Sequence, residues 1–287
     1  VGTPYLPRLG ETVIGDAWWW KPGGKGGNQA MAAARHGAAT VMIGALGDDG
    51  FGERLRERLA AAGVSLAAIR TVGAGSGRCV AIQEAAGDYA AIVVSGANRR
   101  IDAEQVAASA DAIRDAAILV LQDEVGEPAN AAAARIARAV GVTVLLNAAP
   151  ARPLGALAGL IDVLVVNAVE AEQLGAPAVT DLAGAGRAAE ALRGLAPTVV
   201  VTAGGAGVAA VSATERVALA AHPVVRPETH GAGDLFVGAL AVRLAAGDPL
   251  AGALRYANAA AALHVGTPES ARDALGPAEV RALLARG

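Results

Sequence analysis

The sequence predicts an α/β fold, a three-layer α/β/α sandwich built around a mostly parallel central sheet. Short apolar strands alternate with helical stretches through the middle of the chain, and this alternation implies right-handed crossovers between parallel strands. The composition agrees, because the chain is rich in Ala, Leu and Val, contains 37 glycines and has only 3% aromatic residues. We expect residues 1–287 to form a single domain.

The N-terminal third predicts a small extra sheet beside this sandwich. Its expected elements, in order, are a strand over 11–20, a helix over 28–36, a strand over 40–43, a helix over 50–62 and strands over 79–83 and 89–94. Gly37 ends the first helix as a C-terminal cap. Gly87-Asp88 is a hairpin signal between the last two strands. The strands within about 11–20 and 79–95 are expected to form a lid over a site at the sheet edge.

The rest of the chain alternates strand and helix and then ends in helices. The expected strands are 117–121, 142–146, 163–166 and 198–201, with helices over 128–140 and 181–195 between them. The expected C-terminal helices are 233–246, 249–265 and 277–286. Each strand is short and almost wholly apolar, as in a parallel sheet that is covered on both faces.

Composition and charge exclude several classes of function. The net charge is −3 and the only lysines are Lys21 and Lys25, so no basic face for nucleic acid is expected. Cys79 is the only cysteine, which excludes an intrachain disulfide and favours a reducing cytoplasm. No signal peptide precedes Pro4, and no apolar stretch reaches the ~18 residues that suggest a membrane span. We therefore expect a cytoplasmic protein with small-molecule ligands.

The strongest chemical signal is the segment 228–236. Its glycines, Gly231 and Gly233, bring backbone N–H groups together where a helix begins, which suits the charge on a transferred phosphoryl group. Asp234 lies in the first helical turn, where the helix dipole favours its ionised form. Phosphoryl transfer requires little more than a carboxylate that accepts the nucleophile's proton. A glycine turn before an acidic first turn explains the segment equally well.

A second signal is the glycine-rich loop 23–30. It is not a Walker A loop, because no Gly-Lys-Ser/Thr follows at the required spacing. Its glycines allow close approach of a ligand, and Lys25 and Asn28 supply donors for sugar hydroxyls. Asn28 is also explained as a helix N-cap, although a cap does not account for four glycines around one lysine.

Three weaker signals follow strand ends. Residues 167–170 fit a capping box, which we favour, or the ordering of waters around a Mg²⁺–phosphate group. Residues 202–207 offer bare backbone to a nucleotide, or form a simple glycine turn. Residues 122–124 follow the strand 117–121, where α/β proteins place ligand groups, but a surface loop is as good an explanation.

Taken together and in this order, these motifs resemble the ribokinase-like (PfkB-type) carbohydrate kinases over nearly the whole chain. Residues 23–30, followed by 32–38, and residues 231–234 carry the resemblance. The other segments that look familial are 47–52, 96–98, 147–151 and 167–170. Within the family, the Gly-Gly-Lys-Gly-x-Asn-Gln form is most similar to ribokinases. The resemblance implies transfer of the γ-phosphate of ATP to a hydroxyl of a small sugar.

The resemblance also implies a role for each matching residue. Asp234 would be the catalytic base, and the anion hole would be Gly231, Ala232 and Gly233. The implied sugar-binding residues are Gly24, Lys25, Asn28 and Glu124. The implied nucleotide-side residues are Asn167 and Glu170 for the Mg²⁺–phosphate region, Thr202, Gly204 and Gly207 for the nucleotide, and Asn258 near the adenine. Glu170 would contact Mg²⁺ only indirectly.

The acceptor and the activity both leave alternatives. Ribose phosphorylated at its 5-hydroxyl is the leading acceptor, with nucleoside, fructose and deoxyketonate acceptors open. A non-catalytic regulator that binds sugar or nucleotide is a further alternative. A dinucleotide oxidoreductase is disfavoured, because no Gly-x-Gly-x-x-Gly joins a first strand to its helix.

Two features of the sequence depart from the family pattern. Family members open with a strand that bears an acidic sugar ligand, yet no acidic residue precedes Glu11 here. We therefore expect that part of the native N-terminus is missing, rather than that the sugar site is incomplete. Glu228 stands where ribokinases usually carry Asp, and residues 265–270 also differ, which argues against activation by K⁺ and against a strict ribose assignment.

The predicted lid suggests self-association. On a strand over 11–20, Trp18 and Trp20 would share one face and Trp19 the other. Two indoles on a thin sheet suggest a partner surface, and resemblance to family members that pair through this lid implies a homodimer.

Overall fold

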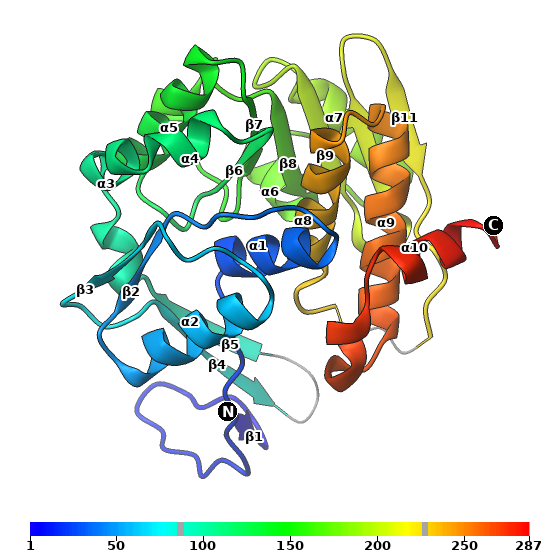
Figure 1. Ribbon diagram of the computed structural model, residues 1–287. Coiled ribbons are helices and arrows are strands. Elements are labelled where there is room, and N and C mark those ends of the chain that lie inside the picture. Colours follow the sequence, from blue (N-terminus) through cyan, green and yellow to red (C-terminus); the bar gives the residue numbers. More distant parts are fainter. Residues whose placement is uncertain (85–88, 226–228, 287) are drawn as a thin grey trace.

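The computed structural model describes residues 1–84, 89–225 and 229–286. Its centre is a six-stranded sheet in the order β11-β10-β9-β8-β7-β6 (Figure 1). The strands are β6 (Ile118–Gln122), β7 (Thr143–Asn147), β8 (Val163–Asn167), β9 (Thr198–Thr202), β10 (Val208–Val211) and β11 (Arg216–Leu219). β6 to β9 pair in parallel, and only β10 runs antiparallel to its neighbours β9 and β11, which confirms a mostly parallel sheet.

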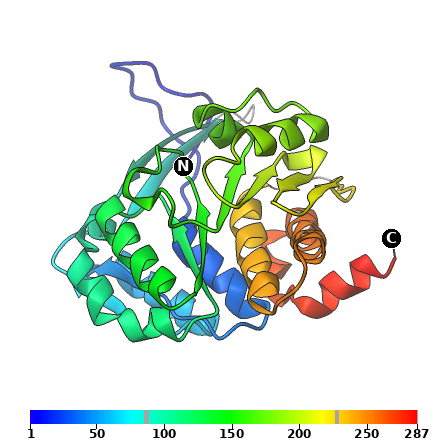
Figure 2. The same cartoon turned by 90° about the horizontal axis from the view of Figure 1, so that it is seen from above.

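Helices cover both faces of this sheet, as Figure 2 shows from above. One face carries α3 (Ala103–Ala108), α4 (Ala110–Arg114), α5 (Glu127–Ala139), α6 (Ala168–Gln173) and α7 (Leu182–Ala191). The other carries α1 (Lys25–Arg35), α8 (Ala232–Ala245), α9 (Leu250–Gly266) and α10 (Pro277–Leu284). Successive strand residues alternate between the two cores: Val199 and Val201 face the first and Val200 the second. The three-layer α/β/α prediction is therefore confirmed.

Helices α1 and α8 lie unusually close together because of one glycine. A Cβ at Gly238 would stand 2.6 Å from the Cβ of Ala32 and 2.7 Å from the carbonyl oxygen of Gln29. Only a residue without a side chain allows this approach. The contact brings the first turns of both helices to one place, the edge where the parallel strands end.

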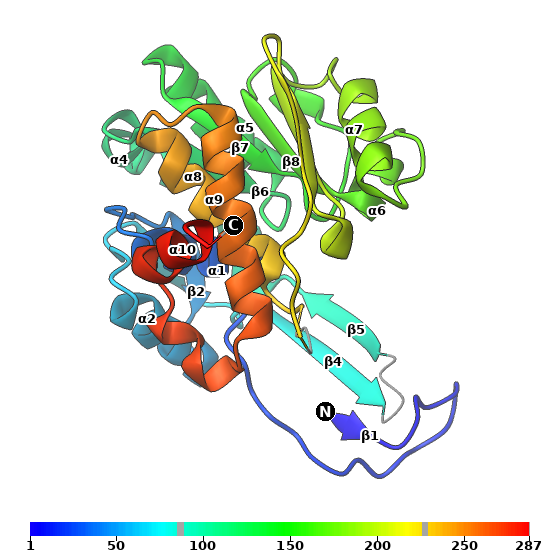
Figure 3. The same cartoon turned by 90° about the vertical axis from the view of Figure 1, so that its right-hand side faces the viewer.

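A smaller sheet projects from the sandwich (Figure 3). It has the order β1-β4-β5 and consists of β1 (Gly2–Thr3), β4 (Arg78–Glu84) and β5 (Tyr89–Val94). Residues 4–24, between β1 and α1, contribute no further strand. The remaining elements are β2 (Gly44–Gly47), α2 (Gly50–Ala61), β3 (Ile69–Val72) and the short helices η1 (Gly96–Arg100), η2 (Gly155–Leu157), η3 (Gly204–Ala206) and η4 (Glu269–Ala274). The expected pairing of β4 with β5 is confirmed, whereas Gly87-Asp88 lies outside the described residues.

The strand expected over 11–20 is wrong. This segment is a loop whose only pairing is one bridge between Ala17 and Gly2. Its apolar side chains have no sheet face to pack against, since Ile14 is 88% and Trp18 76% exposed. The argument from alternating tryptophans is wrong with it, because Trp18 and Trp19 are both exposed.

The strand expected over 40–43 is displaced, and only Val41 there forms an isolated bridge, to Ser65. The strand itself is β2, four residues later, paired with β3. The apolar run led the prediction to the wrong residues. At Gly47, in the true strand, a Cβ would collide with the carbonyl oxygen of Ala74, so packing there requires a residue that carries no hydrophobic signal.

No helix in the described part of the chain combines the length and the apolar character needed to cross a membrane. The other predicted strands and helices are confirmed to within a few residues.

Candidate active site

Polar residues gather at the carboxyl ends of the central strands, the side of the sheet that we call its edge below. Gln122, Asn147, Asn167 and Thr202 are the last residues of β6, β7, β8 and β9. Gln122 pairs with Asn147, and Asn167 with Thr202, so the four strands end side by side. In open α/β sheets this carboxyl edge is where ligands bind.

Asp234 stands at this edge in the first turn of α8. The helix begins after Gly231, whose left-handed φ of 78° would strain any other residue. Oδ2 of Asp234 accepts a hydrogen bond from Nδ2 of Asn28 (2.8 Å), and Oδ1 accepts one from Nε2 of Gln29 (3.1 Å). Two amides on α1 therefore hold the carboxylate that the sequence predicts as the base.

The predicted anion hole is partly occupied by the protein itself. The N–H of Ala232 donates to the carbonyl oxygen of Thr229 (3.2 Å) and closes a turn. Gly233 is exposed, and nothing lies within 4 Å of where its Cβ would be. Backbone at the start of α8 is thus open to a ligand, but the N–H of Ala232 must exchange partners to contact one.

The predicted sugar-binding residues lie next to Asp234. The N–H of Lys25 donates to Oε2 of Glu124 (2.8 Å), across the turn made by Gly24 at φ 92°. Burial raises the pKa of Glu124, the nearby charge of Asp234 raises it further, and Lys25 opposes both. The helix N-cap is Gly24, so the interpretation of Asn28 as the cap is wrong. Asn28 is instead inside α1, where its side chain contacts Asp234.

Asn167 and Glu170 form the capping box that we favoured. Oδ1 of Asn167 accepts from the N–H of Glu170 and Oε2 of Glu170 from the N–H of Asn167, both at 2.8 Å. The box does not exclude a role at the site. Burial raises the pKa of Glu170, Lys25 lowers it and Asp234 raises it, so this carboxylate belongs to the same group of charges.

A directly coordinated metal has little support among the described residues. Within them, no three His, Cys, Asp or Glu side chains gather in a way that could hold an ion. The buried carboxylate of Glu170 is a hard oxygen donor of the kind that Mg²⁺ contacts through water. An indirect contact of Glu170 with Mg²⁺, which the resemblance implies, is compatible with this donor and stays a prediction.

The predicted nucleotide residues gather between β9, β11 and α9. At Gly207, with φ 116°, a Cβ would collide with the carbonyl oxygen of Leu219. Nδ2 of Asn258 donates to the carbonyl oxygen of the next residue, Ala220 (2.8 Å). Thr202 is the last residue of β9 and Gly204 the first of η3, just before Gly207 in the chain. Gly207 is required by packing, so its identity alone does not indicate a nucleotide.

The positions that depart from the family pattern are only partly visible. Glu228 lies outside the described residues. In the segment 265–270, α9 ends at Gly266, and Glu269 forms an ion pair with Lys21 (2.5 Å). Glu269 is thus engaged in an ion pair on the surface, and the prediction about K⁺ stays a prediction.

Sequence reasoning missed two groups of buried polar residues. Gln29, Gln122 and Asn147 form a hydrogen-bonded amide chain that ends on Asp234. The side chain of Asp123 is only 1% exposed and pairs with Arg152, whose Nε donates to Oδ1 (2.9 Å). Burial raises the pKa of Asp123. Gln29 lies in the loop 23–30, Gln122 and Asp123 lie in 122–124, and Asn147 begins 147–151, so each belongs to a segment that the sequence singled out without indicating these contacts.

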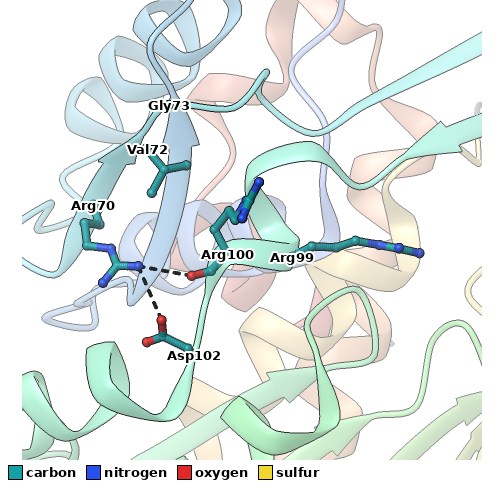
Figure 4. Close-up of a pocket in the computed structure, with 6 residues that line it drawn as sticks. All are labelled: Arg70, Val72, Gly73, Arg99, Arg100 and Asp102. Carbon is teal, nitrogen blue, oxygen red and sulfur yellow. Dashed lines mark hydrogen bonds and ion pairs between the residues drawn. The ribbon is translucent and has the colours of Figure 1, made fainter.

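A separate, open cavity lies between β3 and η1 (Figure 4). Its volume is about 520 Å³, and its lining includes Arg70, Arg99, Arg100 and Asp102. Arg70 is bonded to the carbonyl oxygen of Arg100 (3.1 Å) and lies 3.6 Å from Asp102, while the side chain of Arg99 extends away from them. None of the predicted site residues lines it.

Comparison with known proteins gives consistent similarities. A model of the pfkB family carbohydrate kinases matches residues 3–275. The chain is 36% identical to the ribokinase of Bacillus subtilis (strain 168) over 262 residues, 90% of this chain and 86% of that protein. It is 31% identical to the deoxyribokinase of Salmonella typhi over 244 residues, 83% of this chain and 79% of that protein. The solved structure of Arabidopsis thaliana ribokinase complexed with ribose and ATP is similar with a TM-score of 0.90, at 30% identity, covering 99% of this chain and 94% of that one.

Proposed function

Because the chain belongs to the pfkB family of carbohydrate kinases, we propose that residues 1–287 act as one kinase domain that phosphorylates ribose at its 5-hydroxyl. Members of this family are phosphotransferases with an alcohol group as acceptor and ATP as donor. One observation carries the proposal: Asp234, Asn28, Lys25 and Glu124 converge at the sheet edge where α8 begins. The similarity to ribokinases, at 36% and 30% identity, supports ribose as the acceptor.

In the proposed reaction, Asp234 accepts the proton of the sugar hydroxyl. As that oxygen forms its bond to the γ-phosphorus of ATP, the bond from phosphorus to the β,γ-bridging oxygen breaks and ADP leaves. The proton passes from Asp234 to solvent afterwards, so the products are sugar phosphate, ADP and H⁺. Asn28 holds Oδ2 of the base, and the N-terminal N–H groups of α8, from Gly231, Ala232 and Gly233, stabilise the charge on the moving phosphoryl group.

The remaining residues bind and orient the two substrates. Gly24, Lys25, Asn28 and Glu124 hold the sugar. Thr202, Gly204, Gly207 and Asn258 line the nucleotide side. Asn167 and Glu170 would order water around Mg²⁺, and the ion would neutralise negative charge on the phosphates.

The lid offers an apolar surface for self-association. Val80 and Ile92 form a cross-strand pair of β4 and β5 and are 48% and 70% exposed. Apolar pairs exposed on a thin sheet favour a partner. We therefore propose a homodimer through the lid, which sedimentation tests: a monomer well above micromolar concentration would contradict it. We place the enzyme in the cytoplasm, where ATP is supplied and the lone Cys79 stays reduced.

The acceptor assignment is tested by ADP release from Mg²⁺–ATP with a panel of acceptors. The panel contains ribose, 2-deoxyribose, fructose, a deoxyketonate and nucleosides, and the phosphorylated position of each product is found by NMR. We expect ribose to give the highest kcat/KM and ribose 5-phosphate as the product. A higher value for 2-deoxyribose, which the deoxyribokinase relative makes the second candidate, keeps the kinase and reassigns the acceptor. Binding of ATP without ADP release from any acceptor favours the regulator.

A further inference from the structure

A chain of amides connects the proposed base to the interior of the sheet. Nε2 of Gln29 donates both to Oδ1 of Asp234 (3.1 Å) and to Oδ1 of Asn147 (3.0 Å). Oε1 of Gln29 accepts from Nε2 of Gln122 (2.8 Å). Gln29 is only 3% exposed, so its amide is held away from water, whereas its partners Asp234 and Gln122 are half-buried. The side chain thus has three hydrogen bonds to three different elements of the fold.

Two backbone contacts anchor the ends of this chain. Nδ2 of Asn147 donates to the carbonyl oxygen of Val165 in β8 (3.1 Å). Nδ2 of Asn130, in α5, donates to the carbonyl oxygen of Gln122 (2.8 Å). Gln29 therefore joins the first turn of α8 to three parallel strands. A shift of Asp234 relative to the sheet breaks buried hydrogen bonds, which is costly.

A glycine makes the chain possible. A Cβ at Gly26 would lie 2.9 Å from Oε1 of Gln122. Any side chain at this position would displace the amide of Gln122 from Gln29. Gly26 thus has a task in the glycine-rich loop besides any approach of the loop to a ligand.

The orientation of every amide in the chain follows from the charge of Asp234. An ionised carboxylate only accepts hydrogen bonds, so Gln29 must present its NH₂ group to Asp234. Its oxygen then points to Gln122, which must also present NH₂, while Asn147 presents its oxygen to Gln29. Only one set of orientations satisfies all three amides, and it matches the ionised base.

We propose that Gln29 is a positioning residue for Asp234, an inference that rests on the proposed function. Gln29 fixes Oδ1 on the buried side of the carboxylate and leaves Oδ2, beside the half-buried Asn28, to take the proton of the sugar hydroxyl. Gln29 does not touch the substrate. Its loss lets the carboxylate rotate and lowers kcat, while the sugar-binding residues and KM stay as they are.

The test compares Gln29→Met with a matched control, Gln105→Met. Gln105 is also a buried amide, and its Nε2 donates to the carbonyl oxygen of Gly44 (2.6 Å). Among the described residues, its side chain has no hydrogen bond to Asp234 or to any other residue of the proposed site. We expect Gln29→Met to lower kcat by roughly 10–100-fold, as misplaced catalytic groups do, with KM for ribose within about threefold. Gln105→Met lowers Tm and leaves kcat unchanged. Equal kcat in Gln29→Met and wild type overturns the proposal.

A second variant gives a readout that a structural role does not move. Gln29→Glu sets a second carboxylate against Asp234, and two like charges at this distance raise the pKa of one of them. The acidic limb of the kcat–pH profile therefore moves to higher pH than in wild type. A limb that stays in place in an active Gln29→Glu contradicts the inference.

The inference is separable from the proposed function. If the wild-type protein phosphorylates no acceptor, the proposed function fails. Thermal unfolding then tests whether the hydrogen bond between Gln29 and Asp234 couples the two residues. The losses of Tm in Gln29→Met and Asp234→Asn are then compared with the loss in the double variant. Non-additive losses support the link between the two side chains, and additive losses overturn it.

Discussion

The carboxylates at the proposed active site and those at the base of the lid, the small sheet β1-β4-β5, are held in opposite ways. We call the contacts around Asp49 at that base the lid anchor. At the edge, burial raises the pKa of Glu124 and Glu170, so their ionised forms are disfavoured there. At the base of the lid, hydrogen bonds from Ser76 and Gly52 lower the pKa of Asp49 from 3.8 to about 2. At the proposed active site the charge of Glu124 and Glu170 is destabilised by burial. At the base of the lid the charge of Asp49 is stabilised by hydrogen bonds that join α2 to the segment before β4. Carboxyl groups whose pKa is raised by burial are enriched in functional sites, whereas those whose pKa is lowered stabilise the fold at neutral pH.

The lid anchor is a compact set of contacts. Asp49 caps α2 through the N–H of Gly52 (2.8 Å) and accepts from both the N–H and the hydroxyl of Ser76 (2.9 and 2.7 Å). Arg78, the first residue of β4, donates to the same carboxylate (2.9 Å) and lies over the ring of Phe51. The lid strand is therefore fixed at its root, while its far end projects outward.

The largest effect on stability is expected from forcing α1 and α8 apart. Gly238→Ala places a Cβ 2.6 Å from that of Ala32, and overpacking of this kind costs about 1–3 kcal/mol. Asp234 moves away from Asn28, so kcat falls as well. Gly252→Ala is the control, because nothing lies within 4 Å of its Cβ position in α9, and Ala there adds a few tenths to ~1 kcal/mol of stability. Denaturant unfolding and kcat of both variants measure this; a Gly238→Ala protein as stable as wild type would show that the helices are free to separate.

Glu124→Gln sharpens the comparison at the edge. Since burial raises the pKa of the folded carboxyl above 4.5, its ionised form destabilises the fold at neutral pH, and a neutral amide removes that cost. We expect a higher Tm at pH 7, a gain that disappears as pH falls below the pKa of the free carboxyl. KM for the sugar rises about tenfold, near 1.4 kcal/mol of lost binding. A variant with lower Tm and unchanged KM contradicts the functional assignment of Glu124.

Asp49→Asn tests the anchor by its pH dependence. A carboxyl whose folded pKa lies below its unfolded value adds stability that is present above pH 3.8 and lost as pH falls toward 2. Because this carboxylate is partly open to solvent, we expect a contribution of about 1 kcal/mol. Wild-type stability should fall more steeply than that of Asp49→Asn between pH 4 and 2. If the unfolding free energies of wild type and Asp49→Asn change in parallel over that pH range, the charge of Asp49 does not stabilise the lid anchor.

The smallest effect on the isolated subunit is expected on the outer lid. Ile92 is 70% exposed, so Ile92→Asn removes little buried surface and leaves Tm nearly unchanged at low concentration. The same change places an amide in the proposed dimer surface and shifts sedimentation toward the monomer. Unaltered association of Ile92→Asn locates the interface elsewhere.

The two regions also differ in what the sequence revealed. At the edge, strand ends and glycine-rich loops carry strong local signals, and the residues assigned to the sugar and the base do lie together. Gln29 gave no such signal of its role, because its partners stand 93 and 118 positions away and only the packing of α1 on the sheet joins them. Local periodicity contains no information on contacts of that range.

In the lid, local patterns misled. The run of three tryptophans and Ile14 has the composition of a strand, but a strand requires a partner and a face to cover. The structure gives this segment one bridge, and β1 takes the edge of the sheet instead. Apolar composition therefore predicted the sandwich and the lid strands β4 and β5 well, and it failed in the lid only over 11–20, where no sheet face is available to cover.

The central claim, that Asp234 is the base of a sugar kinase, is tested most directly by Asp234→Asn. Asparagine keeps the size of the side chain and removes its ability to take a proton. We predict that kcat with ribose falls by about 10²–10⁴-fold while calorimetric Kd values for ribose and ATP stay within a few-fold of wild type. A kcat equal to that of wild type, in a variant that binds both substrates, would contradict the account.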